Sequence, residues 1–187
     1  MKKRIFDLSA TLLFFPIIFF IILVVAIVLL IIEKKKIVYW SRRFGKNNVI
    51  FLMPKFRTMK LNSPDLPTHL FRDSNLYLTK TGKFIRKYSL DEFLQFFSVL
   101  KGEMSLVGPR PALHSQFNLI QMREKYDLQY LKPGITGLAQ VFGRDKLSLK
   151  NKIRYENIYS KKKSIKLDVF IILLTIKNIF LSKNISH

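Results

Sequence analysis

The sequence predicts a mainly α-helical α+β fold with a small β-hairpin, attached to a membrane through its N-terminal segment. Residues 8–32 carry no charge and are mostly Leu, Ile, Val and Phe, and about 20 such residues suffice to cross a bilayer as a helix. Two β-prone runs flank Gly45–Asn48, which is typical of a hairpin. A second apolar segment at 167–181 is too short to span.

The apolar run has basic residues on both sides, and these raise the question of its topology. Lys2, Lys3 and Arg4 precede it and the lysines at 34–36 follow it, so both ends are expected to stay in the cytosol. A straight span cannot satisfy both ends, whereas a helix bent at Pro16 could enter and leave by the same face. An ordinary signal anchor remains the alternative. A cleaved signal peptide is disfavoured, because the run is long and ends in charged residues.

A cytosolic domain at 37–187 is expected to follow the membrane segment at 1–36. In chain order, the sequence predicts strands at 37–40 and 49–52, a loop at 62–67, a helix at 115–126, and turns at 132–134 and 136–137. The last helix, about 161–183, is either a core helix or one lying in the membrane interface, and the lysines that open it favour the interface. Asp7 could pair with Lys3 or Arg4 where the membrane segment begins.

The chain is strongly basic, with 33 Lys and Arg against 12 Asp and Glu and a net charge of +21. This excess indicates an anionic partner: nucleic acid, a phosphorylated metabolite or an acidic lipid surface. No nucleic-acid-binding motif is visible, so nucleic acid is not expected. The absence of cysteine excludes a disulfide framework and a thiolate metal site. His69, His114 and His187 show no spacing typical of metal ligands.

Ser89-Leu90-Asp91-Glu92 contains the one adjacent pair of carboxylates in the chain. Taken alone, this stretch fits a capping box, with Ser89 at the N-cap of a helix and Glu92 at its third position. Apolar residues then follow at helical spacing, giving a predicted buried face: Leu90, Phe93, Leu94, Phe97 and Leu100. In this interpretation, Asp91 is an exposed residue of the first helical turn.

A second interpretation is chemical, because basic residues surround the pair. Arg86 precedes it, and Arg110 follows in Gly108-Pro109-Arg110-Pro111, where two prolines stiffen the backbone. These cations, with the amides of a helix N-terminus, could hold a diphosphate. An ionised Asp91 there could bind a divalent cation or attack phosphorus. Lys55, Arg57 and Lys60 form a second basic cluster, and such a cluster by itself is usually a solvated or lipid-facing surface.

The order of these motifs resembles the bacterial sugar transferases that are monotopic phosphoglycosyl transferases, which load a sugar phosphate onto polyprenyl phosphate. The resemblance runs from Lys3-Arg4-Ile5-Phe6-Asp7 to Leu167-Asp168-Val169. Between these ends the motifs are Lys55-Phe56-Arg57-Thr58-Met59, Ser89-Leu90-Asp91-Glu92 with Gln95, Leu100-Lys101-Gly102-Glu103-Met104-Ser105, Gly108-Pro109-Arg110-Pro111, and Lys132-Pro133-Gly134-Ile135-Thr136-Gly137 with Gln140, Gly143 and Arg144.

The resemblance implies an enzyme on the cytosolic face of the bacterial inner membrane, with a re-entrant helix bent near Pro16. It implies that Asp91 is the nucleophile and a Mg²⁺ ligand, and that Glu92 assists it. The phosphate-binding residues that it implies are Arg86, Arg110, Lys55, Arg57 and Arg144.

In the implied reaction, a UDP-sugar and polyprenyl (undecaprenyl) phosphate give polyprenyl-diphosphate-sugar and UMP through a phosphosugar intermediate on Asp91. This is the first membrane step of surface glycan synthesis, and downstream glycosyltransferases would use its product. The alternative function is a membrane-anchored basic module that binds anionic lipid or nucleic acid without catalysis.

The chain departs from the family pattern at several positions. Pro16 lies only nine residues after Asp7, and Leu94 stands where members commonly carry proline. Ser41, Pro54 and Phe142 also differ, and changes there could alter sugar or nucleotide specificity. The extra N-terminal membrane helices of larger relatives are lacking, so the chain is expected to be the minimal catalytic unit.

Overall fold

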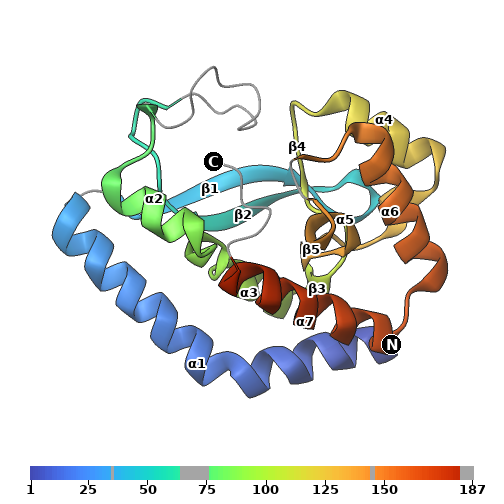
Figure 1. The fold of residues 1–187 in the computed structure, drawn as a ribbon, viewed down its shortest axis with the longest axis horizontal. Helices are drawn as coiled ribbons and strands as arrows, with labels where there is room; N and C mark the ends of the chain where they lie inside the picture. Colours follow the sequence, from blue (N-terminus) through green and yellow to red (C-terminus); the bar gives the residue numbers. More distant parts are fainter. Residues whose placement is uncertain (35, 64–75, 144–145, 182–187) are drawn as a thin grey trace.

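A mixed body of helices and two small sheets lies along one long apolar helix (Figure 1). The computed structural model describes residues 1–34, 36–63, 76–143 and 146–181. With η marking a 3₁₀-helix, the elements are α1 (Lys2–Glu33), β1 (Val38–Phe44), η1 (Lys46–Asn48), β2 (Ile50–Phe56), α2 (Lys80–Lys87), η4 (Leu90–Glu92), α3 (Gln95–Lys101), β3 (Ser105–Val107), β4 (Ala112–Leu113), α4 (Phe117–Lys125), η5 (Leu128–Tyr130), β5 (Gly134–Thr136), α5 (Leu138–Val141), α6 (Leu149–Lys162) and α7 (Ile165–Phe180). The predicted mainly helical fold with small sheets is confirmed. Of the predicted loop at 62–67, residues 64–67 lie outside the described ranges.

The predicted hairpin is present and longer than expected. β1 and β2 pair antiparallel, from Val38 opposite Phe56 to Phe44 opposite Ile50, and β4 adds to the other side of β1. This strand order makes β2 an edge strand, where Pro54 removes no ladder hydrogen bond. Lys55 therefore sits near the end of a paired strand, on a rigid element.

The second sheet pairs β3 with β5 in parallel, with Ser105 opposite Gly134 and Val107 opposite Thr136. Part of β5 occupies the stretch where two turns were predicted, and that prediction is wrong for Gly134 and Thr136. The reason is tertiary packing: a Cβ added to Gly108 would lie 2.2 Å from the Lys132 carbonyl oxygen. Glycine is required there because two backbones approach this closely.

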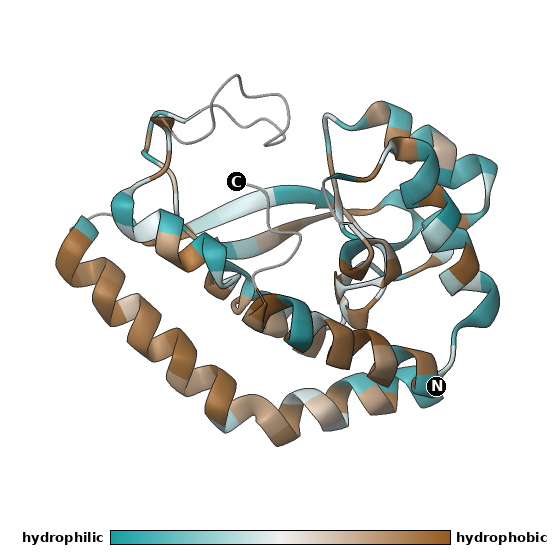
Figure 2. Cartoon of the chain, in the orientation of Figure 1, coloured by the Kyte–Doolittle hydropathy of each residue, from teal (hydrophilic) through white to brown (hydrophobic). Residues whose placement is uncertain are grey.

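Helix α1 is bent, and both of its arms lie along the body (Figure 1). It contains Pro16, and proline is the usual cause of such a bend. By length and composition alone α1 could cross a membrane. A stripe along its C-terminal arm is buried against β2, α2 and the segment after η4; it consists of Ile18, Ile22, Val25 and Leu29. Most of the other residues of that arm are exposed and apolar (Figure 2).

The N-terminal end of α1 is joined to the body by polar contacts. The Arg4 guanidinium donates to the carbonyl oxygens of Val99 (2.5 Å) and Leu100 (2.8 Å), which lie in the last turn of α3, where helical carbonyls lack partners. Asp7 is buried and accepts from Ser105 Oγ at 2.8 Å. The predicted pairing of Asp7 with Lys3 is present at 4.0 Å. Both ends of α1 therefore contact the same body.

Helix α7 has its polar face turned inward. Asp168, Thr175 and Asn178 share one face with buried Ile171, at helical spacing. Asp168 accepts from Lys3 Nζ and Tyr159 Oη, both at 2.7 Å. The opposite face exposes apolar side chains: Val169, Phe170, Leu173, Ile176 and Phe180. Helices α1 and α7 thus form the apolar side of the molecule in Figure 2.

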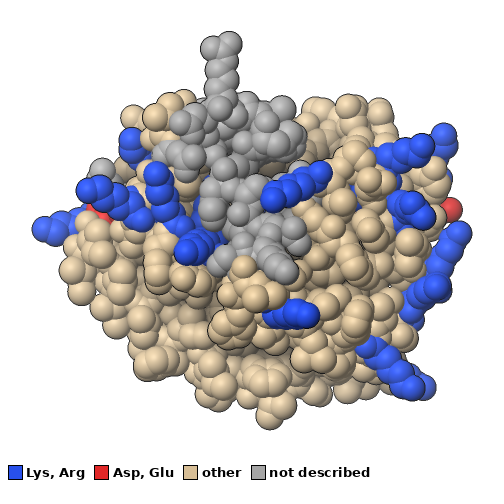
Figure 3. All heavy atoms as spheres, viewed as in Figure 1, with Lys and Arg blue, Asp and Glu red and all other residues tan. Residues whose placement is uncertain are grey.

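The predicted boundaries of the last helix are corrected by the structure. Its described part begins at Ile165, where Ser164 Oγ accepts from the Leu167 amide at 3.2 Å. The lysines at 161–162 close α6 instead, a helix that the sequence did not predict. In the face shown in Figure 3, lysines and arginines lie around the body, and the surface over α1 shows almost none.

Candidate active site

Asp91 and Glu92 form part of a short 3₁₀ turn, η4, between α2 and α3. Ser89 before it is in the left-handed region, with φ 54° and ψ 25°, and makes no side-chain cap, while α3 begins only at Gln95. The predicted capping box is therefore wrong. So is the exposed Asp91 that it implied, because Asp91 and Glu92 are only 7% and 8% exposed.

The apolar residues around the pair lie on the buried side, as the predicted apolar face required. Leu90, Phe93 and Phe97 pack together with Leu94 in the cluster that includes the buried stripe of α1. The backbone is what differs, because Ser89 is left-handed and a 3₁₀ turn stands where the regular helix was expected to begin. The carboxylates are consequently held directly behind the apolar helix.

Glu92 is the meeting point of two cations. Its Oε1 accepts from Lys55 Nζ at 3.1 Å and from Arg110 Nη2 at 2.9 Å. The side chains of Glu92 and Lys55 are 9% and 13% exposed, whereas that of Arg110 is 30% exposed and keeps a solvent-accessible part. β2, η4 and the segment after β3 thus bring together Lys55, Asp91, Glu92 and Arg110, all of them predicted site residues.

Burial lowers the pKa of the Lys55 ammonium to about 8. The carboxylates of Glu92 and Asp91 oppose this shift, and the Arg110 guanidinium adds to it. With this pKa, Lys55 is mostly protonated at neutral pH and about half protonated near pH 8. The Arg43 guanidinium also lowers this pKa, so a third cation lies near the two carboxylates.

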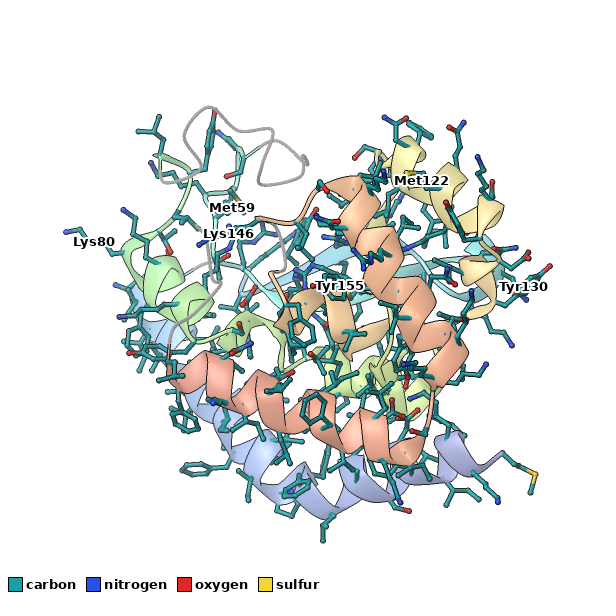
Figure 4. All side chains as sticks on the ribbon, turned by 45° about the vertical axis from the view of Figure 1, so that its right-hand side comes forward. Met59, Lys80, Met122, Tyr130, Lys146 and Tyr155 are labelled. Carbon is teal, nitrogen blue, oxygen red and sulfur yellow. The ribbon has the colours of Figure 1, made fainter. Side chains whose placement is uncertain are left out.

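Two other predicted phosphate-binding arginines each make further contacts with the surrounding chain. The Arg86 guanidinium donates to Thr58 Oγ1 at 3.0 Å and contacts the sulfur of Met59, labelled in Figure 4, at 3.4 Å. Arg57 donates to the Lys36 carbonyl oxygen at 2.9 Å and lies over the Tyr39 ring. Arg57 therefore holds the chain that leaves α1. Arg144 lies outside the described residues.

The adjacent carboxylates suit Mg²⁺ bound together with a phosphorylated substrate. Within the described ranges, no group of three or more His, Cys, Asp or Glu side chains could enclose a metal ion. Mg²⁺ commonly takes only one or two protein carboxylates and completes its shell with substrate phosphates and water. Asp91 and Glu92 supply that number of oxygen ligands at the site.

Sequence reasoning missed Arg123 and Glu156, a buried ion pair beside Arg110. The one available signal was that Glu156 is the only acidic residue in α6, since a lone acid in a basic helix often has a specific partner. Its partner could not have been identified, because Arg123 lies 33 residues away in the chain.

The comparisons with known proteins decide the family. The family model described as "Bacterial sugar transferase" matches residues 1–182. The chain belongs to the bacterial sugar transferase family. The predicted resemblance is confirmed.

Three relatives illustrate the range of this sugar transferase family. The UDP-N-acetylgalactosamine-undecaprenyl-phosphate N-acetylgalactosaminephosphotransferase of Aeromonas hydrophila is 34% identical, over 95% of this chain and 43% of its own length. The uncharacterized sugar transferase EpsL of Bacillus subtilis (strain 168) is 37% identical, over 99% of this chain and 90% of its own. The undecaprenyl-phosphate galactose phosphotransferase of Salmonella typhimurium is 34% identical, over 75% and 32%. The chain thus spans less than half of two of these relatives and nearly all of EpsL.

Proposed function

We propose that this sugar transferase moves a sugar 1-phosphate from a UDP-sugar to undecaprenyl phosphate or a similar polyprenyl phosphate. The observation that carries the proposal is the Asp91–Glu92 pair, buried with Lys55 and Arg110 and held behind the apolar helix α1. Relatives named as undecaprenyl-phosphate phosphotransferases support the same acceptor and reaction class. A basic module that only bound lipid would not need two buried carboxylates at this place.

In the first step, an Asp91 carboxylate oxygen attacks the phosphorus that bears the sugar. A bond forms between that oxygen and the phosphorus, and the bond from the phosphorus to the bridging oxygen of the diphosphate breaks. The bridging oxygen keeps the electron pair and leaves as part of UMP. The product is an acyl phosphate that joins Asp91 to the sugar, whose own C1–O bond is untouched.

In the second step, a phosphate oxygen of the polyprenyl phosphate attacks the same phosphorus. The bond to Asp91 breaks and returns the carboxylate, and polyprenyl-diphosphate-sugar leaves. The two displacements replace one transfer between two bulky substrates, so each needs only one substrate positioned beside Asp91. The lipid-linked sugar is then a substrate for further glycosyltransferases of a surface glycan pathway.

The neighbours of Asp91 act through charge and position. The Lys55 ammonium and Arg110 guanidinium neutralise phosphate oxygens, whose negative charge would otherwise repel the attacking carboxylate. Glu92 holds both cations through one oxygen and thereby fixes their separation. Mg²⁺, which Asp91 would hold with the help of Glu92, supplies further neutralisation of the diphosphate when bound.

The membrane arrangement that we propose is a re-entrant one, at the cytosolic face of the inner membrane. A straight span would place the two ends of α1 on opposite sides of a bilayer, yet Arg4 and Leu29, near its two ends, are both tied to the body. Helix α7 would lie in the interface with its exposed apolar face toward lipid. The soluble nucleotide and the lipid phosphate would then meet at one surface.

Mass spectrometry of the protein incubated with a UDP-sugar and Mg²⁺, without lipid acceptor, tests this proposal. A phosphosugar adduct on Asp91 and one equivalent of UMP are expected, and polyprenyl phosphate added later should discharge the adduct. The Asp91→Asn variant should form no adduct and lose on the order of 10³-fold or more in turnover, as expected when a covalent nucleophile is removed. An Asp91→Asn enzyme with full activity would exclude the mechanism.

A further inference from the structure

The backbone around Arg110 is held by three consecutive carbonyl groups, each of which accepts from a different element. The Pro109 carbonyl accepts from the Gly134 amide of β5 at 2.9 Å. The Arg110 carbonyl accepts from Arg123 Nη2 of α4 at 2.9 Å, and the Pro111 carbonyl from Arg43 Nη1 of β1 at 3.2 Å. With φ of both prolines also fixed, this segment has little freedom left.

Among these donors, Arg123 is held by a buried carboxylate, that of Glu156. Its guanidinium donates from Nη2 and Nε to the two carboxylate oxygens of Glu156, at 2.6 and 2.9 Å. Arg123 and Glu156 are 8% and 4% exposed. Met122 and Tyr155, labelled in Figure 4, mark the places on the neighbouring helices α4 and α6 from which the two side chains come.

Stability alone is a weak reason for such a pair. Burying two charges costs desolvation energy, and well-packed apolar residues of similar volume often replace a buried ion pair without loss. What apolar residues cannot do is donate to the Arg110 carbonyl. A planar guanidinium can serve both carboxylate oxygens and a further acceptor at fixed angles, which a lysine ammonium does not reproduce.

We propose that Arg123, oriented by Glu156, is a positioning residue that fixes the Arg110 backbone and so aims the Arg110 guanidinium at the substrate phosphate. This inference rests on the proposed function. Arg123 is not itself a catalytic residue, since it is buried and its hydrogen bonds are with Glu156 and the Arg110 carbonyl.

Two variants remove the contact in different ways. Arg123→Lys keeps the positive charge but loses the planar guanidinium that donates to Glu156 and to the Arg110 carbonyl. The double variant Arg123→Met/Glu156→Met removes both charges and fills the space with apolar side chains. Arg154→Lys is the matched control, because Arg154 is an exposed arginine of α6. Both test variants should lower kcat/KM for UMP release by roughly 10- to 100-fold, the range expected when a catalytic group is misplaced by about 1 Å. The control should retain wild-type activity.

A double-mutant cycle with Arg110→Lys separates positioning from general destabilisation. If Arg123 acts through Arg110, adding Arg123→Lys to Arg110→Lys should cost less than about twofold, because the group that it aims is already absent. Where turnover is too slow to measure, the rate of phosphosugar adduct formation in a single turnover can replace kcat/KM in the same cycle. Arg123→Lys leaves buried acceptors without their donor, so its melting temperature in detergent should lie below that of Arg154→Lys. The cycle, and not the melting temperature, therefore decides the positioning role.

The outcomes distinguish a failure of the positioning role from a failure of the proposed transferase function. A wild-type protein that releases no UMP with any UDP-sugar would overturn the proposed function, and the inference with it. An active wild-type protein with losses that multiply in the cycle would overturn the positioning role alone. So would an Arg123→Met/Glu156→Met enzyme of wild-type activity.

Discussion

The Glu92→Gln substitution tests how charge is organised around Asp91. It preserves the shape of the side chain but removes the negative charge that Lys55 and Arg110 share. Breaking a buried ion pair usually costs about 3–5 kcal/mol, because the remaining charge is left without a partner. Here the loss should be smaller, because Lys55 can give up its proton.

The free-energy cost of deprotonating Lys55 follows from its pKa. With a pKa of about 8, removing the proton at pH 7 costs on the order of 1 kcal/mol, and this caps the penalty from Lys55. The Arg110 side chain is 30% exposed and can turn to solvent, which adds roughly 0.2–1 kcal/mol, as for an exposed pair. Glu92→Gln should therefore lower the free energy of unfolding by only about 1–2 kcal/mol.

The Glu92→Gln variant should lose much of its UMP release although its free energy of unfolding changes little, because a neutral Lys55 no longer attracts phosphate. The carboxylate of Glu92 raises the pKa of Lys55, so its removal lowers that pKa further, and the cation is present only at lower pH. UDP binding by calorimetry in EDTA should weaken above about pH 8 in the wild type. In Glu92→Gln, the same weakening should begin at lower pH.

Chemical denaturation in detergent gives the free energy of unfolding of each variant, and UMP release gives its activity. Glu124→Gln is the control, because Glu124 is exposed and accepts a hydrogen bond from the neutral Asn48 amide. A variant that binds UDP with the wild-type pH profile would refute the shared-charge argument. A loss of stability above about 4 kcal/mol would refute the cap set by Lys55.

Three further predictions follow from α1, α7 and the glycine contact. Single cysteines from Lys2→Cys and Lys36→Cys should both resist a membrane-impermeant thiol reagent in intact cells and react after permeabilisation; labelling of the first from outside would establish a full span. Leu173→Glu, on the exposed face of α7, should move protein from the membrane fraction to the soluble fraction, whereas the exposed Gln121→Glu on α4 should not; equal distributions would contradict an interfacial α7. Gly108→Ala should abolish folding, seen as loss of extractable protein, because its Cβ would meet a backbone oxygen at 2.2 Å; a well-folded variant would show that the two segments can separate.

Features encoded locally could be predicted from the sequence. The hairpin around Gly45–Asn48, the long apolar helix and the helix at 115–126 all depend on patterns within about twenty neighbouring residues, and all are present. The two prolines around Arg110 likewise indicated a stiff segment, although its hydrogen-bond donors lie elsewhere in the chain.

The candidate site could be named but not assembled from the sequence. Glu92 is 37 residues from Lys55 and 18 from Arg110, and no periodicity links such separations. The strongest local pattern, the capping box at Ser89, predicted the wrong backbone. The apolar residues beside it do pack in the core, but the left-handed backbone of Ser89 replaces the N-cap geometry that the pattern required.

The polar contacts of the N-terminal end of α1 have a consequence for biosynthesis. Asp7 leaves the ribosome 98 residues before Ser105, and Arg4 emerges 95 residues before Val99. Lys3 precedes its partner Asp168 by 165 residues. If the apolar segment inserts as proposed, these groups must stay hydrated at the membrane surface until their partners are made. The contact between Lys3 and Asp168 can form only when translation is nearly complete.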